Sequence, residues 1–182
     1  MKFRILLMAV SVSAIVLPGA IPVVWAQGQG TPAHSAETRS VEPEEFLRLA
    51  YSSASLQGQA AQLAAGRDTR PEVKSYATAA VDFRQGLLQR IEAFARERNM
   101  PLPSVKEFQH QVIIENLEPL DYLALSRRYA EMQMQALDQE LSIYRAASNS
   151  PQQEIKSFAD QVIPELEKQR EGAQAMYDTI KP

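Results

Sequence analysis

Apolar side chains recur at three- and four-residue steps along most of this chain, which is the spacing of one face of an α-helix. No alternating stretch of useful length indicates a β-strand. The predicted helices cover residues 42–66, 71–98, 105–116, 120–147 and the chain from 151 onward. Each long helix has one apolar face to bury. The pattern therefore predicts an all-α fold, an antiparallel up-down four-helix bundle with a short extra helix between the second and third long helices.

Helix ends are marked by capping residues and by proline. The expected N-caps are Ser40 or Glu42, Asp68 or Thr69, Ser104 and Ser150. Ser104 with Glu107, and Ser150 with Gln153, have the spacing of a capping box, in which the hydroxyl accepts a backbone N–H and the longer side chain reaches back. Pro164 lies inside the last helix and is expected to kink it.

The first 26 residues have the three parts of a secretory signal. Lys2 and Arg4 precede an uncharged apolar run, and Val24 and Ala26 stand at the −3 and −1 positions of a cleavage site. A retained membrane anchor is the alternative, because 22 uncharged residues are long enough to span a bilayer. The expected organisation is a signal peptide at 1–26, a disordered linker at 27–41 and the helical domain at 42–182.

Composition narrows the chemistry further. The 182 residues include no cysteine, which excludes a disulfide scaffold, a thiolate nucleophile and thiolate metal sites. The two histidines are His34 in the expected linker and His110 on the short helix, and both are interpreted as solvated or packing residues rather than metal ligands. The net charge is −3, or −5 after loss of Lys2 and Arg4, which is not the basic footprint that nucleic acid requires.

One polar residue interrupts the apolar stripe of each long helix: Gln57, Arg84, Gln133 and Gln169. A buried polar group needs a hydrogen-bonding partner. One such residue per helix is the basis for a candidate buried polar layer, in which Arg84 needs an acidic or carbonyl partner. The alternative is that each residue lies at the edge of its stripe and reaches water, as a long arginine side chain can.

Three passages carry a family resemblance: residues 63–64 with 71–77 (LA and PEVKSYA), residues 120–123 (LDYL), and residues 155–166 (IKSFADQVIPEL). With these passages the chain resembles an exported bacterial family of ferritin-like four-helix proteins that is catalogued as a domain of unknown function. Its members often have the label of outer-membrane proteins. The resemblance implies a ferritin-like arrangement of the four long helices.

Departures from this family concern its metal-ligand positions. Members commonly carry an acidic residue in the first helix and histidines in the other three. Here Gln57 stands at the acidic position, and Phe83 and Arg84 replace an acid–histidine pair. Gln133, or a close neighbour, and Gln169 stand for the remaining histidines. The resemblance therefore implies that this member has lost its metal ligands, and no metal or other cofactor is expected.

These observations predict a non-catalytic exported protein, periplasmic or secreted, with a structural, binding or envelope-stress role. An envelope protein is a conceivable partner, whereas nucleic acid is not expected and no membrane span remains after signal cleavage. Two alternatives stay open. A partner-binding or chaperone-like protein would expose a large apolar patch. A divergent ferritin-like metal-binding protein would hold stoichiometric iron or manganese.

Overall fold

A computed structural model describes residues 41–67, 69–103 and 108–181 of the chain. All regular structure in these ranges is helical, which confirms the all-α prediction. The helices are α1 (Pro43–Gly66), α2 (Pro71–Glu97), α3 (Phe108–Leu117), α4 (Tyr122–Ala147) and α5 (Gln153–Ile180). They belong to one compact unit, residues 36–182. The predicted signal peptide, the linker up to residue 40 and the capping box at 104–107 lie outside the described residues.

The helices begin close to the predicted positions. Glu42, one of the two N-caps predicted for the first helix, is the N-cap of α1, although its side chain makes no capping bond; the other, Ser40, lies outside the described residues. Pro43 and Pro71 start α1 and α2, where a missing N–H costs nothing.

Arg70 is the N-cap residue of α2. The Thr69 hydroxyl instead donates to the carbonyl oxygen of Ala64 at 3.0 Å and so satisfies the end of α1, and Asp68, the other predicted cap, lies outside the described residues. The prediction of Thr69 as a cap is therefore wrong.

The Ser150 capping box is also wrong. Gln152 is the N-cap of α5, and no side chain caps that helix. Ser150 Oγ instead accepts the backbone N–H of Gln152 at 3.2 Å, a bond within the turn that precedes the helix. Pro164 lies inside α5, which continues on both sides of it.

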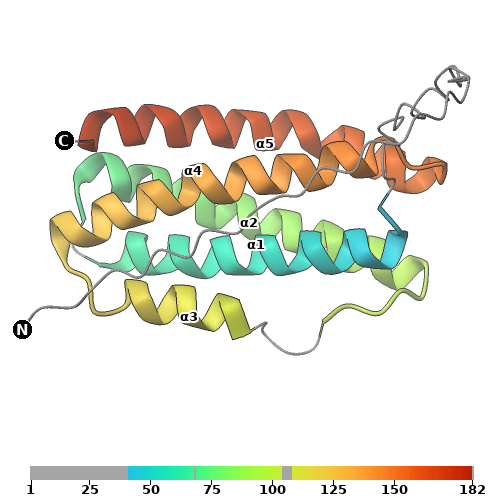
Figure 1. The fold of residues 1–182 in the computed structure, drawn as a ribbon, viewed down its shortest axis with the longest axis horizontal. Helices are drawn as coiled ribbons and strands as arrows, with labels where there is room; N and C mark the ends of the chain where they lie inside the picture. Colours follow the sequence, from blue (N-terminus) through green and yellow to red (C-terminus); the bar gives the residue numbers. More distant parts are fainter. Residues whose placement is uncertain (1–40, 68, 104–107, 182) are drawn as a thin grey trace, which may run out of the picture. The chain divides into compact units, whose positions relative to one another are not determined.

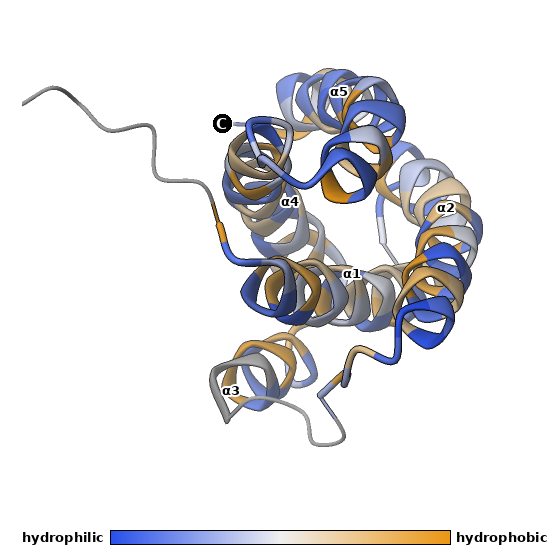
Figure 2. Ribbon diagram, turned by 90° about the vertical axis from the view of Figure 1, so that its right-hand side faces the viewer, coloured by the Kyte–Doolittle hydropathy of each residue, from blue (hydrophilic) through white to orange (hydrophobic). Residues whose placement is uncertain are grey.

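The four long helices contact one another in a closed order, which Figure 2 shows nearly end-on. Helix α1 packs against α2 and α4, and α5 packs against the same two helices. Helix α3 lies outside this group, against α1 and α4 (Figure 1). The interior enclosed by α1, α2, α5 and α4 is the place where side chains from several helices meet.

Two apolar clusters fill this interior. One contains Phe46, Leu87, Ile91 and Tyr144, and the other contains Ala61, Val73, Leu125 and Tyr129 among their members. On α1 and α2 the sequence passes from one cluster to the other at a buried polar residue, Gln57 and Arg84 respectively. The polar residues therefore lie between two apolar regions rather than at the end of the interior.

The helical spacing of apolar residues in 120–147 also predicts that Tyr122 and Leu125 share the inward face of α4, and this prediction is wrong for Tyr122. Tyr122 is 43% exposed and its neighbour Leu123 is 45% exposed. Helix α4 begins at Tyr122, so this first turn lies before the part of the helix that packs inward; Leu125 is the first fully buried residue of the stripe. In the described part of the chain, no helix is both long enough and apolar enough to cross a bilayer.

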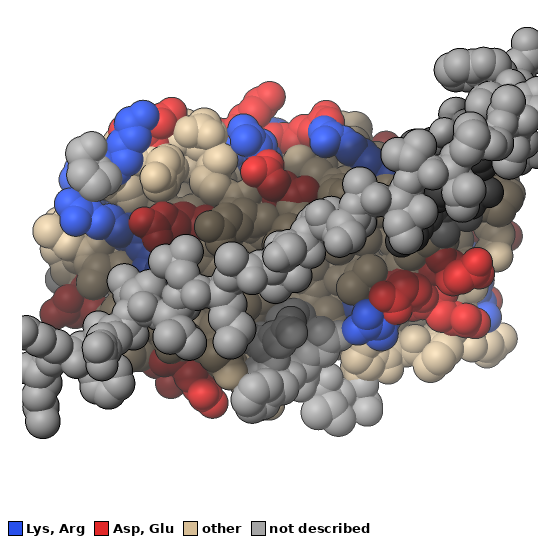
Figure 3. Space-filling view, viewed as in Figure 1, with Lys and Arg blue, Asp and Glu red and all other residues tan. Residues whose placement is uncertain are grey.

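Acidic and basic side chains are interspersed over the face shown in Figure 3, including its upper edge, where Figure 1 places α5. Exposed ion pairs join α4 to α5. Arg145 binds Glu167 at 3.0 Å, and Arg170 binds Asp138 at 3.0 Å. Among the described residues visible in Figure 3, both signs of charge are therefore mixed rather than gathered into one broad field.

Candidate functional site

The most unusual feature of the interior is a salt bridge between α2 and α4. Nη1 of Arg84 donates to Oε1 and Oε2 of Glu140 at 2.8 and 2.7 Å. The side chains of Arg84 and Glu140 are only 2% and 0% exposed. A charge removed from water to this extent is very costly unless it is paired and hydrogen-bonded. Each of the two residues thus depends on the other.

Gln57 of α1 joins this pair into a three-helix cluster. Nη2 of Arg84 donates to Oε1 of Gln57 at 2.6 Å, and Nε2 of Gln57 donates to Oε2 of Glu140 at 2.8 Å. The same amide nitrogen also donates to Ser53 Oγ at 3.0 Å. An amide can play both parts because it has one accepting and one donating end. We call Gln57, Arg84 and Glu140 the central polar cluster.

A glycine allows α1 and α2 to come close at this point. A Cβ atom added to Gly58 would lie 3.4 Å from Cβ of Arg84. The arginine stem therefore passes directly beside the α1 backbone, one residue from Gln57. On its own helix, Arg84 lies beside an aromatic ring, with its Cζ 5.1 Å from the ring centroid of Phe83. The guanidinium is thus held by apolar packing as well as by hydrogen bonds.

A family model with the description "Domain of unknown function (DUF4142)" matches residues 29–176. The chain belongs to the DUF4142 family. The match includes the central polar cluster and the three passages that carried the resemblance at 63–77, 120–123 and 155–166. It confirms membership of a family catalogued as a domain of unknown function. No curated protein and no solved structure matches the chain.

In this DUF4142 protein, the four polar residues singled out from the sequence have different surroundings. Gln57 and Arg84 come together in the central polar cluster. Gln133 is buried on α4, where its Nε2 has no hydrogen-bond partner among the described residues. Gln169 is half-buried on α5, and its link to the interior is a backbone one: its carbonyl oxygen accepts the Tyr76 hydroxyl at 3.3 Å.

Sequence reasoning missed Glu140, the acidic partner that Arg84 requires. A signal for it exists. Glu140 follows Gln133 by seven residues, which is two helical turns, so both lie on the same face of α4. It also stands directly before Leu141, whose side chain belongs to the apolar stripe. This seven-residue spacing from Gln133 is the sequence signal that identifies Glu140 as a candidate partner for Arg84.

Two buried tyrosines, Tyr129 and Tyr144, and one half-buried tyrosine, Tyr76, lie around this cluster of the DUF4142 domain, and their removal from water suppresses ionisation. Desolvation raises the pKa of Tyr76 to about 12, with the positive charge of Arg84 opposing the shift and the negative charge of Glu140 adding to it. Desolvation also raises the pKa values of Tyr129 and Tyr144 well above the ordinary range. These phenols are therefore neutral hydrogen-bonding groups at physiological pH.

The cluster's chemistry is hydrogen bonding among its own members. Both carboxylate oxygens of Glu140 accept bonds from Arg84, and Oε2 also accepts one from Gln57. Elsewhere in the described ranges, no three histidine, cysteine, aspartate or glutamate side chains form a group that could hold a metal ion. An arginine cation beside the carboxylate would also repel a metal ion brought to the same oxygens.

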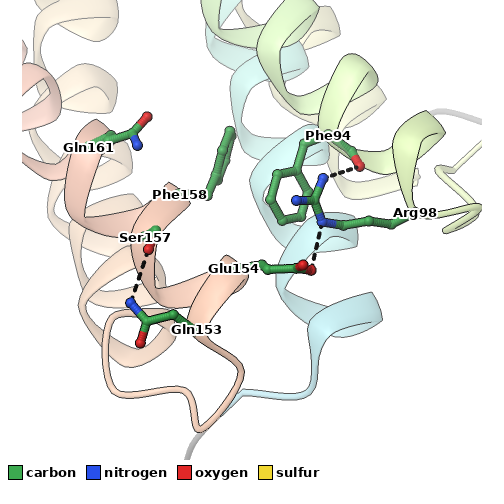
Figure 4. Close-up of a pocket in the computed structure, with 7 residues that line it drawn as sticks. All are labelled: Phe94, Arg98, Gln153, Glu154, Ser157, Phe158 and Gln161. Atoms are coloured by element: carbon green, nitrogen blue, oxygen red, sulfur yellow. Dashed lines mark hydrogen bonds and ion pairs between the residues drawn. The ribbon is translucent and has the colours of Figure 1, made fainter.

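A second feature is a surface pocket of about 310 Å³ between the end of α2 and the start of α5 (Figure 4). Phe94 and Phe158 form its apolar wall, with their ring centroids 4.7 Å apart. Arg98 stacks on Phe94, with its Cζ 3.8 Å from the ring centroid, and donates to Glu154 at 3.0 Å. This pocket lies at the surface and is built from two helices, whereas the central polar cluster is buried and joins three helices, so the cluster is the stronger candidate site.

Proposed function

We propose that this protein is an exported, non-catalytic four-helix-bundle protein with a ferritin-like arrangement and a structural, binding or envelope-stress role. The way the long helices neighbour one another, α1 beside α2, α2 beside α5, α5 beside α4 and α4 beside α1, supports the bundle, because each helix has two neighbours and one enclosed face. The family resemblance supports the ferritin-like arrangement. The apolar run and cleavage-site residues at 1–26 support export.

The observation that carries this proposal is the pairing of Glu140 with Arg84. Metal-binding bundles of the ferritin-like class direct several carboxylates and histidines inward from all four helices. Here the interior positions hold Gln57, Arg84 and Gln133, and the one carboxylate of the cluster accepts two bonds from a guanidinium. These residues do not fit a pair of metal ions. Arg84 instead supplies, from the protein itself, the positive charge that neutralises Glu140.

Metal analysis tests the non-metal role. The chain without residues 1–26, expressed in medium enriched in iron and manganese, should carry far less than one metal ion per chain. Its thermal midpoint should be unchanged by added Fe²⁺ or Mn²⁺, since a ligand that binds the folded state raises that midpoint. A stoichiometric ion, with a midpoint that rises with metal concentration, would support the divergent metal-binding protein instead.

Export has its own test. The full chain expressed in a Gram-negative bacterium should be recovered from the periplasmic fraction with Gln27 as its first residue. Ala26→Arg should block cleavage, because the −1 position accepts only small residues. Recovery of the uncleaved wild-type chain in the membrane fraction would show that the segment is a retained anchor.

A chaperone-like role is the second candidate. The observation in its favour is that three large apolar side chains of α3 and the first turn of α4, Val112, Tyr122 and Leu123, are 37–45% exposed. Apolar segments of unfolded polypeptide would be the partner. The chain should then suppress aggregation of a heat-unfolded protein, measured by light scattering, and Tyr122→Ser with Leu123→Ser should remove that effect. Equal scattering with and without the wild-type chain would rule this role out.

A further inference from the structure

Three polar atoms of α4 are buried without a hydrogen-bond partner among the described residues. They are the hydroxyl oxygens of Tyr129 and Tyr144 and the amide nitrogen Nε2 of Gln133. Tyr129 and Tyr144 are 0% exposed, and Gln133 is 1% exposed. About nine in ten buried polar groups in proteins have a partner, so three such atoms on one helix need an explanation.

These atoms and Glu140 lie on one face of α4. Steps of four, seven and four residues lead from Tyr129 to Gln133, Glu140 and Tyr144, and each step closely matches whole turns of an α-helix. The face therefore carries four polar groups, of which only Glu140 is fully paired by side chains of α1 and α2. It forms a polar line along the inner face of α4, beside Gln57 of α1 and Arg84 of α2.

Glu140 belongs both to this line and to the central polar cluster, so the two are continuous on α4. The charge of Arg84 acts on the Tyr129 hydroxyl, and the charges of Glu140 and Arg84 act on that of Tyr144. Around them lie other rings, with Tyr76 6.3 Å from Tyr129 and Phe46 5.2 Å from Tyr144, measured between ring centroids. The two hydroxyl groups are thus surrounded by aromatic rings and charged side chains and do not reach bulk solvent.

The chemistry of the three groups selects their ligand. A phenol hydroxyl and a carboxamide are neutral, and each can both donate and accept a hydrogen bond. The nearby positive and negative charges already neutralise each other in the Arg84–Glu140 pair. The matching ligand is a small neutral molecule that can both donate and accept hydrogen bonds. Buried water is such a molecule, and globular proteins hold about one buried water per 27 residues, bound to polar groups that lack another partner.

We propose that ordered internal water molecules bind at Tyr129, Gln133 and Tyr144 on the inner face of α4 and extend the central polar cluster along the interior. In this arrangement water accepts from the Tyr hydroxyls and from Gln133 Nε2. The hydrogen-bonded network then runs from α1 and α2 along α4. Water is thereby a structural component of this fold and not a solvent that the interior excludes.

Counting long-lived water molecules tests this inference. Oxygen-17 and deuterium magnetic relaxation dispersion on the chain from residue 27 detects internal waters by their slow exchange. We expect a clear internal-water signal in the wild-type chain. Tyr129→Phe and Tyr144→Phe should each reduce it by about one molecule and lower the urea midpoint, because each removes a hydroxyl that holds a water. Tyr122→Phe, with an exposed ring, is the matched control and should change neither quantity.

Truly unpaired hydroxyls would behave in the opposite way. Removing an unpaired buried hydroxyl relieves a desolvation cost, so the urea midpoint of the Phe variants would rise or stay the same. The water count decides between the two cases. A wild-type chain without long-lived water, or a count that is unchanged in both buried Tyr→Phe variants, would overturn the proposal.

Discussion

Arg84 and Glu140 are both buried charges, and each is stabilised by pairing with the other. Each is removed from water, and each finds in the other a partner with suitable hydrogen-bonding geometry. Such a pair often adds little net stability compared with apolar residues of similar volume. Loss of one member, however, leaves the other charge buried and unpaired in an interior of low dielectric constant. The pair is therefore best probed by removing its members singly and together.

We predict that Glu140→Leu lowers the free energy of unfolding by about 3–5 kcal/mol, because Arg84 remains buried without a counter-charge. The double variant Arg84→Met with Glu140→Leu should recover most of that loss. Urea unfolding followed by far-UV circular dichroism measures both changes. A double variant no more stable than the single one would show that the two residues do not act as a pair.

The matched control is an exposed ion pair with similar geometry. Arg90 of α2 and Glu165 of α5 make two hydrogen bonds at 2.8 and 2.7 Å, but their side chains are 39% and 42% exposed. Glu165→Leu should change the free energy of unfolding by about 1 kcal/mol or less, because both charges remain hydrated. The contrast with Glu140→Leu separates burial from bond geometry.

The sequence predicts the central polar cluster only in part. Gln57 and Arg84 are recognisable because a polar residue on an apolar stripe demands a partner. Glu140 is harder to recognise, because glutamate is among the commonest residues on the solvated side of helices and its burial depends on how α4 is rotated against α1 and α2; the seven-residue spacing from Gln133 is a weak signal by comparison. For Gln169 the sequence predicts too much: the residue lies near the apolar stripe of its helix, but it is only half-buried and its side chain is not part of the cluster.

At the scale of helices, the glycines of α2 and α5 differ in whether a neighbouring helix contacts them. Gly86 of α2 has open space where a side chain would begin, whereas a Cβ at Gly172 of α5 would lie 3.3 Å from the ring of Tyr76. Both glycines lie inside helices, where glycine costs roughly 0.5–1 kcal/mol relative to alanine. The two positions therefore separate helix propensity from packing.

We predict that Gly86→Ala raises the free energy of unfolding by about 0.5–1 kcal/mol. Gly172→Ala should gain less or lose stability, because the Tyr76 ring must move to admit the methyl group. Urea midpoints of the two variants, compared under one set of conditions, measure the difference. Equal stabilisation by both would show that α2 and α5 are not in tight contact at Tyr76.

Helix positions follow from the sequence more closely than helix caps do. Apolar periodicity and proline locate α1, α2, α4 and α5 to within a few residues, because both act within one or two turns of chain. The caps at Thr69 and Ser150 are wrong because a hydroxyl takes whichever backbone group the turn presents. For Thr69 that group is a carbonyl at the end of the preceding helix.

At the scale of the whole molecule, the buried Tyr129 and Tyr144 and the half-buried Tyr76 make the free energy of unfolding depend on pH in the alkaline range. Their folded-state pKa values are raised above the ordinary value of 10.0, so the folded state retains protons that the unfolded state loses. Their contribution is fully present below pH 10 and is lost as the pH rises through the folded-state values. For Tyr76 this window extends from about pH 10 to about pH 12.

We predict that the free energy of unfolding falls above pH 10 by about 1.4 kcal/mol per pH unit for each tyrosine that remains neutral in the folded state. Tyr76→Phe should make this fall less steep by one tyrosine's share. Urea midpoints at pH 9, 10 and 11 give the slopes. A variant with the wild-type slope would show that Tyr76 ionises equally in both states.

The placement of the two central charges along the chain also has a consequence for the order of assembly. Arg84 lies on α2, which follows α1 directly in the chain, whereas Glu140 lies 56 residues further along, on α4. A hairpin of α1 and α2 alone would offer the guanidinium Gln57 but no counter-charge, and α4 with α5 would hold the carboxylate alone. Neither half can close its interior at low cost. The complete chain should therefore unfold in one cooperative transition, with no stable half-molecule on the way.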